Sequence, residues 1–128
     1  MILLDTHAWI WWVAGSPQLS RRASKAIDSA DALAVSAISC WEVAMLAAKG
    51  RLVLDRDPDV WLDLALKLPR VQLLALSPRI AVRSTRLGES PLTDPADCII
   101  VATALEHGCP IASKDERIRR HPSLRVIW

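Results

Sequence analysis

The first six residues, which end in Asp5 and Thr6, constrain the fold of this chain more than any other stretch. Three large apolar residues precede the acid without polar alternation, which is typical of a short strand buried on both faces. Such strands belong to parallel sheets that helices cover on both sides. In open α/β sheets, ligands bind at the carboxyl ends of the strands. The N-terminus therefore predicts a central strand that places Asp5 at a binding crevice.

The same pattern of an apolar run followed by acids returns three times. The later runs and their acids are residues 33–36 with Glu42, 71–76 with Asp94 and Asp97, and 111–113 with Asp115. We expect the five acids to surround one pocket, because the carboxyl ends of parallel strands share one edge of a sheet. Like charges this close destabilise a fold unless a cation neutralises them. Carboxylates without a set of His or Cys ligands favour Mg²⁺ or Mn²⁺ over Zn²⁺.

Helical segments separate the predicted strands. We expect strands at residues 1–4, 31–36, 71–76, 110–113 and 124–128, helices at 7–14, 17–29, 39–49, 58–68, 78–87, 95–107 and 115–120, and a loop at 88–92. This alternation predicts an α/β fold, a three-layer α/β/α sandwich around a central, mostly parallel sheet of four to five strands. A chain of 128 residues is expected to form one such domain, residues 1–128.

Some of the acids also have an ordinary structural explanation. Ser39 and Glu42 have the spacing of a capping box, while Asp94 and Asp97 would occupy the N-cap and N3 positions of their helix. Each such group stabilises a helix by about 1 kcal/mol without any catalytic role. The acids after the first and fourth strands have no clear capping role, however. The whole set therefore favours a metal site.

The composition indicates a globular protein that acts on a polyanion. Hydrophobic residues make up 52% and the mean hydropathy is +0.22, so another chain is expected to cover some apolar surface, most simply in a homo-oligomer. The net charge is +2, but without the five pocket acids the rest of the molecule carries about +7. Such a surface attracts nucleic acid, unless its charges are scattered and merely solvated. A divalent metal beside a phosphodiester stabilises the attacking and leaving oxygens of its hydrolysis.

Other classes of protein are not favoured. The longest apolar runs are far shorter than the ~20 residues of a membrane span, and no basic leader precedes an apolar segment, so we expect a cytoplasmic protein. The three cysteines lack C-x-x-C spacing and are interpreted as small buried residues. No glycine-rich phosphate loop is present. Trp9, Trp11 and Trp12 cannot share one helix face, and we interpret the tryptophans as core and interface residues rather than base-stacking platforms.

Four short motifs follow one another along the chain at characteristic separations. They are Leu4-Asp5-Thr6-His7, Ser39-x-x-Glu42, Asp94-Pro-Ala-Asp97 followed by Ile99-Ile-Val-Ala-Thr-Ala, and Ser113-Lys-Asp115. Each motif alone is weak, but their order and spacing resemble the PIN domain over essentially the whole chain. More specifically, the chain is similar to VapC-type toxins of toxin–antitoxin systems.

The resemblance implies a metal-dependent endoribonuclease that is usually a homodimer. A cognate antitoxin protein would hold it inactive by lying over its groove, and RNA would be its substrate. The implied catalytic residues are Asp5, Glu42, Asp97 and Asp115. Among them Asp5 and Asp97 would ligate Mg²⁺ or Mn²⁺ directly, Glu42 and Asp115 would bind a second metal or hold water, and Asp94 is an additional acid.

Four further residues are expected to support this site. Thr6, Ser39 and Ser113 would orient carboxylates through hydrogen bonds, although helix capping explains them equally well. Family members often carry Arg after the acid matched by Asp97, where this chain has Cys98, so Lys114 is the candidate replacement for a phosphate contact. His7 matches a branch of the family and is interpreted as a packing residue.

Two alternatives to the nuclease remain open at this point. A PIN-like module could hold a metal and an RNA or protein partner without cutting, although its intact set of acids argues against this. A phosphoacceptor domain or an aspartate-dependent phosphatase uses a comparable sheet, but the sequence around Asp5 lacks the second aspartate two residues on. The sequence specifies neither the target RNA nor whether DNA is also cut.

Overall fold

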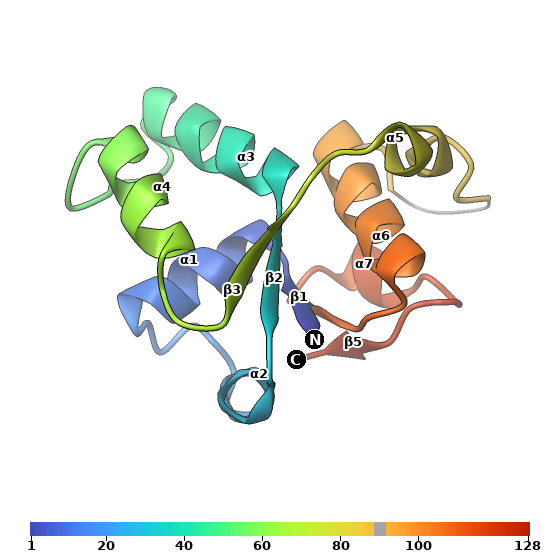
Figure 1. Ribbon diagram of the computed structural model, residues 1–128, viewed down its shortest axis with the longest axis horizontal. Helices are drawn as coiled ribbons and strands as arrows, with labels where there is room; N and C mark the ends of the chain where they lie inside the picture. Colours follow the sequence, from blue (N-terminus) through green and yellow to red (C-terminus); the bar gives the residue numbers. More distant parts are fainter. Residues whose placement is uncertain (89–91) are drawn as a thin grey trace.

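The computed structural model describes residues 1–88 and 92–128 (Figure 1). In the described residues one five-stranded sheet is present, with the strand order β3-β2-β1-β4-β5 and every neighbouring pair parallel. Its strands are β1 (Ile2–Leu4), β2 (Leu33–Ser36), β3 (Val71–Leu74), β4 (Ile111–Ala112) and β5 (Val126–Ile127). The predicted sheet is confirmed, and the N-terminal strand is its centre.

Helices cover both faces of this sheet. They are α1 (Thr6–Ala14), α2 (Arg21–Ser29), α3 (Ala37–Ala48), α4 (Pro58–Leu66), α5 (Pro78–Ser84), α6 (Pro95–His107) and α7 (Glu116–Arg119). Figure 1 shows α1, α3 and α4 to one side of the strands and α5, α6 and α7 to the other. The three-layer α/β/α architecture is therefore confirmed. None of the helices in the described ranges is long and apolar enough to cross a membrane.

Alternate residues of β1 belong to two separate hydrophobic cores. Ile2 and Leu4 pack with the core of α1 and α4, whereas Leu3 packs with the core of α6 and α7. Leu3 and Leu4 are both fully buried. An uninterrupted apolar run suits this strand because each of its faces meets a layer of helices.

The predicted helix ends are correct where the residues at the end suit only one position of a helix terminus. Helix α6 has the predicted bounds, with Asp94 at its N-cap and Gly108 in the left-handed conformation after its last turn. The predicted start of the second helix at Ser16 and Pro17 is wrong. The Ser16 hydroxyl accepts a hydrogen bond from the Gln18 N–H in a turn, and Ser20 caps α2 instead. Of the predicted loop at 88–92, residues 89–91 lie outside the described residues.

The tryptophans of α1 and the three cysteines are buried to different degrees. Trp9 is fully buried, whereas Trp11 and Trp12 are half-buried, so the three indoles of α1 do not share one face. The three cysteines are free thiols, of which Cys109 is buried and the other two are partly buried. Arg21, Arg22 and Lys25 are exposed on α2.

Candidate functional site

The strand order reverses between β1 and β4, which lie side by side at the centre of the sheet. The chain adds β2 and β3 on one side of β1, then returns to add β4 and β5 on the other. Such a switch point opens a crevice at the carboxyl ends of the two strands. Asp5 follows β1 there, with its backbone N–H donating to the Ala112 carbonyl of β4 over 3.0 Å. The Ser113 hydroxyl donates to Asp5 Oδ2 over 2.7 Å and fixes the carboxylate.

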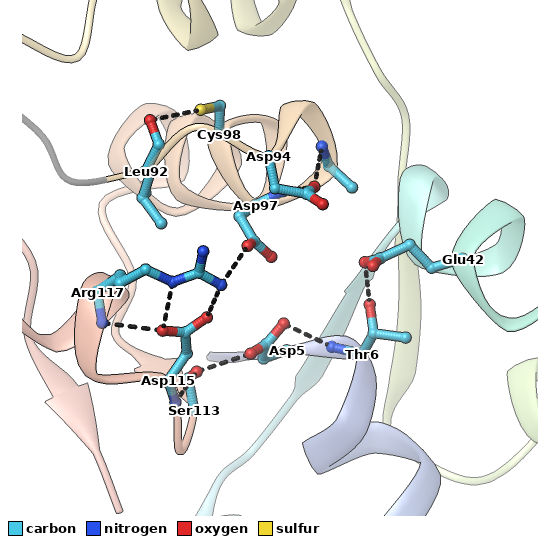
Figure 2. A network of polar contacts seen from close by, with 11 residues as sticks. Asp5, Thr6, Glu42, Leu92, Asp94, Asp97, Cys98, Ser113, Asp115 and Arg117 are labelled. Atoms are coloured by element: carbon cyan, nitrogen blue, oxygen red, sulfur yellow. Dashed lines mark hydrogen bonds and ion pairs between the residues drawn. The ribbon is translucent and has the colours of Figure 1, made fainter. Parts of the chain in front are cut away.

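A cavity of about 470 Å³ occupies this crevice, and all five predicted acids line it. Figure 2 shows their carboxylates arriving from β1, α3, α6 and the segment before α7. The lining residues are Asp5, Thr6, His7, Ala8, Trp11, Glu42, Asp94, Asp97, Lys114, Asp115 and Arg117. Segments more than 100 residues apart in sequence thus meet at one site.

Glu42 is held by a hydroxyl rather than by a capping box. Helix α3 begins earlier than predicted, and its N-cap is Ser36, whose hydroxyl accepts from the Ile38 N–H. Ser39 therefore lies inside the helix, fully buried. The buried Thr6 hydroxyl lies 2.9 Å from Ser39 Oγ and 2.6 Å from Glu42 Oε1, as Figure 2 shows for Glu42. The capping-box interpretation is wrong because the backbone turns helical one residue after β2.

The two acids of α6 have different environments. Asp94 is exposed, and its Oδ1 accepts from the N–H groups of Ala96 and Asp97 at the helix N-terminus. Asp97, one turn along, is partly buried and faces the cavity. Its pKa is raised to about 7 by burial first, then by the negative charges of Asp5, Asp94, Glu42 and Asp115. The capping role predicted for Asp94 is confirmed, but it does not account for Asp97.

Asp5 and Asp115 also cap helices, contrary to the sequence-based expectation. Asp5 Oδ1 accepts from the Thr6 N–H at the start of α1, and Asp115 Oδ1 accepts from the Arg117 N–H at the start of α7. Asp5 alone joins β1 to α1, and three residues that end in Asp115 join β4 to α7, so each acid lies both near a strand end and at a helix start. Capping and a role in the cavity are therefore compatible for the same side chain.

Arg117 is a residue of the site that sequence reasoning missed. Its Nη2 lies 3.0 Å from Asp115 Oδ2 and 3.5 Å from Asp97 Oδ2, so one guanidinium joins both acids (Figure 2). Partial burial works to raise the pKa of Asp115, but the hydrogen bonds and charge of Arg117 outweigh it and lower that pKa. An arginine two residues after an acid, at a helix start, was the available signal.

Lys114, the expected phosphate contact, lines the same cavity, whereas the ion pairs of Asp97 and Asp115 within the described residues are made by Arg117. Its Nζ lies 5.9 Å from the centroid of the Trp11 ring. His7 is exposed on the same side of the cavity, with its ring 5.6 Å from that of Trp11. The Cys98 thiol, next to Asp97 in the chain, points to the Leu92 carbonyl. Arg117 instead supplies the positive charge beside Asp97.

The excess of negative charge in the cavity fits a hard divalent cation. Burial raises the pKa values of Asp5 and Glu42. The hydrogen bonds from Ser113 to Asp5 and from Thr6 to Glu42 oppose this rise only in part. Carboxylate oxygens are the donors that Mg²⁺ and Mn²⁺ prefer. In the conformation of residues 1–88 and 92–128, no three His, Cys, Asp or Glu side chains enclose an ion. The fit therefore rests on donor chemistry and on the repulsion that a cation would relieve.

The Thr6 hydroxyl offers a direct test of how Glu42 is positioned. We expect Thr6→Val to lower activity on nucleic acid roughly 10- to 100-fold, because Glu42 loses the donor that orients it. Free energy of unfolding should fall by about 1–3 kcal/mol, because buried polar atoms lose a partner. Thr6→Ser keeps the hydroxyl and is the matched control. Activity rates and thermal unfolding would be measured, and equal effects of both substitutions would contradict this role.

Comparisons with known proteins agree with the fold and identify the family. The PIN domain family model matches residues 2–124. The chain is 41% identical to "Ribonuclease VapC22" of Mycobacterium tuberculosis in an alignment of 129 positions that covers 99% of this chain and 98% of that protein. A toxin–antitoxin complex from Klebsiella pneumoniae contains a chain 26% identical, with a TM-score of 0.70 over 97% of this chain and 95% of that one. VapBC2 from Rickettsia felis, bound to a promoter DNA fragment, shares the fold at 17% identity, with a TM-score of 0.72 over 98% of this chain and 97% of that one.

Proposed function

The chain belongs to the PIN domain family, and from this premise we propose that it is a metal-dependent endoribonuclease, the toxin of a toxin–antitoxin pair. The observation that supports this most strongly is the gathering of five carboxylates around one cavity at the switch point of the sheet. A relative that is 41% identical over nearly the whole chain is named a ribonuclease. The substrate is RNA, and the bond that is cut is a phosphodiester.

Each of the five acids of the cavity has a proposed role. Asp5 and Asp97 bind Mg²⁺ or Mn²⁺ directly, Glu42 and Asp115 bind a second ion or hold the attacking water, and Asp94 is an additional acid. A bound divalent ion supplies Lewis acidity for the phosphoryl oxygens and a more acidic water. Ser113 holds Asp5 Oδ2, and Thr6, which contacts Ser39, holds Glu42 Oε1. These hydrogen bonds fix the two carboxylates before substrate arrives.

Arg117 is proposed to contact the scissile phosphate. Its side chain is half-exposed, lines the cavity and already bridges Asp97 and Asp115. A guanidinium in this place balances part of the acidic charge when no substrate is bound. Because a planar guanidinium can bind phosphate through two N–H groups, Arg117 is better suited to this contact than Lys114.

The test of this function is cleavage of total cellular RNA by the purified chain, free of any partner protein. We expect discrete fragments with Mg²⁺ or Mn²⁺ and none with a chelator, because the carboxylates alone supply no Lewis acid. Fragments would be mapped by sequencing of their ends, which also identifies the target. Duplex and single-stranded DNA in parallel reactions test whether DNA is also cut. Undiminished cleavage with the chelator would contradict metal dependence.

A non-catalytic binding module is the second candidate for this fold. It would retain RNA or a protein partner without cutting any nucleic acid. A folded, metal-bound chain that cleaves none of the RNAs offered would favour it. Membership of the PIN family and the complete set of acids support the nuclease instead, and they also favour it over a phosphoacceptor domain.

A cognate antitoxin protein and a homodimer are the proposed partners, and the cytoplasm is the proposed location. The similar Klebsiella pneumoniae chain belongs to a toxin–antitoxin complex, which supports the antitoxin. Large apolar side chains that this chain leaves exposed support association with other chains. They include Trp41, Val53, Val60, Leu64, Leu73 and Val82. Light scattering of the purified chain would determine whether it is a dimer.

A further inference from the structure

One side of the cavity is aromatic and cationic rather than acidic. His7, Trp11 and Lys114 line it together, within the same cavity as the carboxylates. The first two lie four residues apart, so one face of α1 presents both rings to the cavity. Lys114 comes from the segment after β4, between Ser113 and Asp115. Nothing in the proposed chemistry of the carboxylates requires an indole here.

Neighbouring rings and the hydrophobic core hold the Trp11 ring in place. Its centroid lies 5.8 Å from that of Trp128 and 5.6 Å from that of His7, and the side chain packs against the hydrophobic core next to the sheet. It is nevertheless only half-buried. A rigid indole with an accessible surface loses little conformational entropy when a flat ligand stacks on it.

The position of Lys114 is compatible with a ligand on this ring. Its Nζ lies 5.9 Å from the ring centroid, close to the outer limit of about 6 Å for a cation–π contact. The side chain is exposed, and because lysine has a flexible four-carbon stem, its ammonium can leave the ring for a phosphate at small cost. An aromatic surface beside a mobile cation suits a group that is flat on one side and anionic on the other. A nucleotide has this chemistry.

We propose that His7, Trp11 and Lys114 form a nucleotide subsite in which Trp11 stacks on an unpaired nucleobase next to the scissile phosphate and Lys114 binds that nucleotide's phosphate. This inference rests on the proposed ribonuclease function and extends it to substrate recognition. Stacking requires a base that is free of a duplex, so the subsite selects single-stranded segments or loops. Of the six tryptophans, Trp11 thus departs from the purely structural role that the sequence suggested.

A binding experiment with mononucleotides tests the subsite without cleavage. The unaltered chain, with its tryptophans labelled with ¹⁵N, is titrated with adenosine 5′-monophosphate and, separately, with ribose 5-phosphate. Both ligands carry the same sugar and phosphate, but only the first has a base. We expect the indole N–H signal of Trp11, identified by its loss in Trp11→Phe, to shift with the nucleotide alone. No shift, or equal shifts with both ligands, would overturn the proposal.

Kinetics with a cleaved RNA test whether the subsite serves the substrate. We expect Trp11→Leu to raise KM about tenfold and to change kcat little, because stacking binds substrate and transition state alike. Trp11→Phe should restore most of the affinity. Trp12→Leu is the matched control, since Trp12 packs against the same core but does not line the cavity. Equal effects of the Trp11→Leu and Trp12→Leu substitutions would assign Trp11 a structural role only.

The outcomes separate this inference from the proposed function. Absence of RNA cleavage by the unaltered chain would refute the nuclease, while the mononucleotide titration would still decide the subsite. Normal cleavage with an unchanged KM in Trp11→Leu would refute the subsite and leave the nuclease in place. If that variant instead lost only the binding of a protein partner, this side of the cavity would be a protein interface and the inference would be wrong.

Discussion

Replacing Asp97 with asparagine is expected to lower the rate of RNA cleavage by roughly a hundredfold or more, the effect of removing one preorganised charged group from an active site. The amide keeps the shape of the side chain but removes its negative charge. Asp97 faces Asp5, Glu42 and Asp115 across the cavity, and its pKa is raised by burial first and then by the charges of the neighbouring acids. Its loss weakens cation binding and leaves the reacting oxygens less well stabilised.

The Asp97→Asn experiment has two informative controls. Asp28 is an exposed aspartate of α2, which precedes β2 and so lies away from the carboxyl ends of the strands, and Asp28→Asn should leave cleavage unchanged. Asp94→Asn retains a side-chain oxygen that can cap α6, so its effect isolates the contribution of the Asp94 charge. Initial rates on one mapped RNA would be compared at saturating Mg²⁺. Cleavage by Asp97→Asn within a few fold of the unaltered chain would contradict the proposed role.

The metal-free protein is expected to become less stable as pH rises from about 4 to about 8. The pKa of Asp97 is about 7 in the folded chain against an ordinary value of 3.8. Between these values the folded state holds a proton that the unfolded state has lost, so unfolding is favoured as pH rises. The stability from this proton is complete below pH 4 and is lost as pH passes 7. The pKa values of Asp5 and Glu42 are shifted in the same direction, whereas that of Asp115 is lowered and opposes them.

Asp97→Asn should therefore stabilise the metal-free fold at pH 8, by a free energy of unfolding on the order of 2 kcal/mol and a melting temperature several degrees higher. At pH 5 the stabilisation by this substitution should be smaller, because part of the stability from the Asp97 proton is still present at that pH. Added Mn²⁺ at pH 8 should stabilise the unaltered chain more than the variant. Thermal unfolding at both pH values, with and without chelator, measures all three effects. A variant less stable than the unaltered chain at pH 8 would show that Asp97 is not under electrostatic strain.

Much of the fold follows from local patterns in the sequence. The central strand is recognisable from its apolar run because both of its faces are buried, which no alternating pattern would allow. Helix α6 has its predicted bounds because aspartate, proline and glycine each suit one position at a helix end. The local pattern misplaced two other helix starts, since Ser20 rather than Ser16 caps α2 and Ser36 rather than Ser39 caps α3.

The sequence predicted the acids of the candidate site but not the hydrogen bonds and ion pairs that hold them. The five carboxylates were named from the sequence, since each follows a predicted strand, and the structure brings all of them to one cavity. The Thr6 hydroxyl that holds Glu42 joins residues 36 positions apart, and Arg117 reaches Asp97 from 20 positions away. No local sequence pattern indicates either contact, because both contacts depend on how α1, α3, α6 and α7 pack around the sheet.

The sequence by itself determined the parallel sheet, its central strand and the identity of the acids, because burial and capping act on residues close in the chain. Only the tertiary structure decided which groups face one another. Ser39 and Glu42 do not form the predicted capping box and instead contact the Thr6 hydroxyl. Arg117, and not Lys114, forms the ion pair with Asp97. Trp11 lines the cavity. The physical reason is that side-chain contacts and pKa shifts depend on distances across the switch point between β1 and β4, which packing of the helices sets.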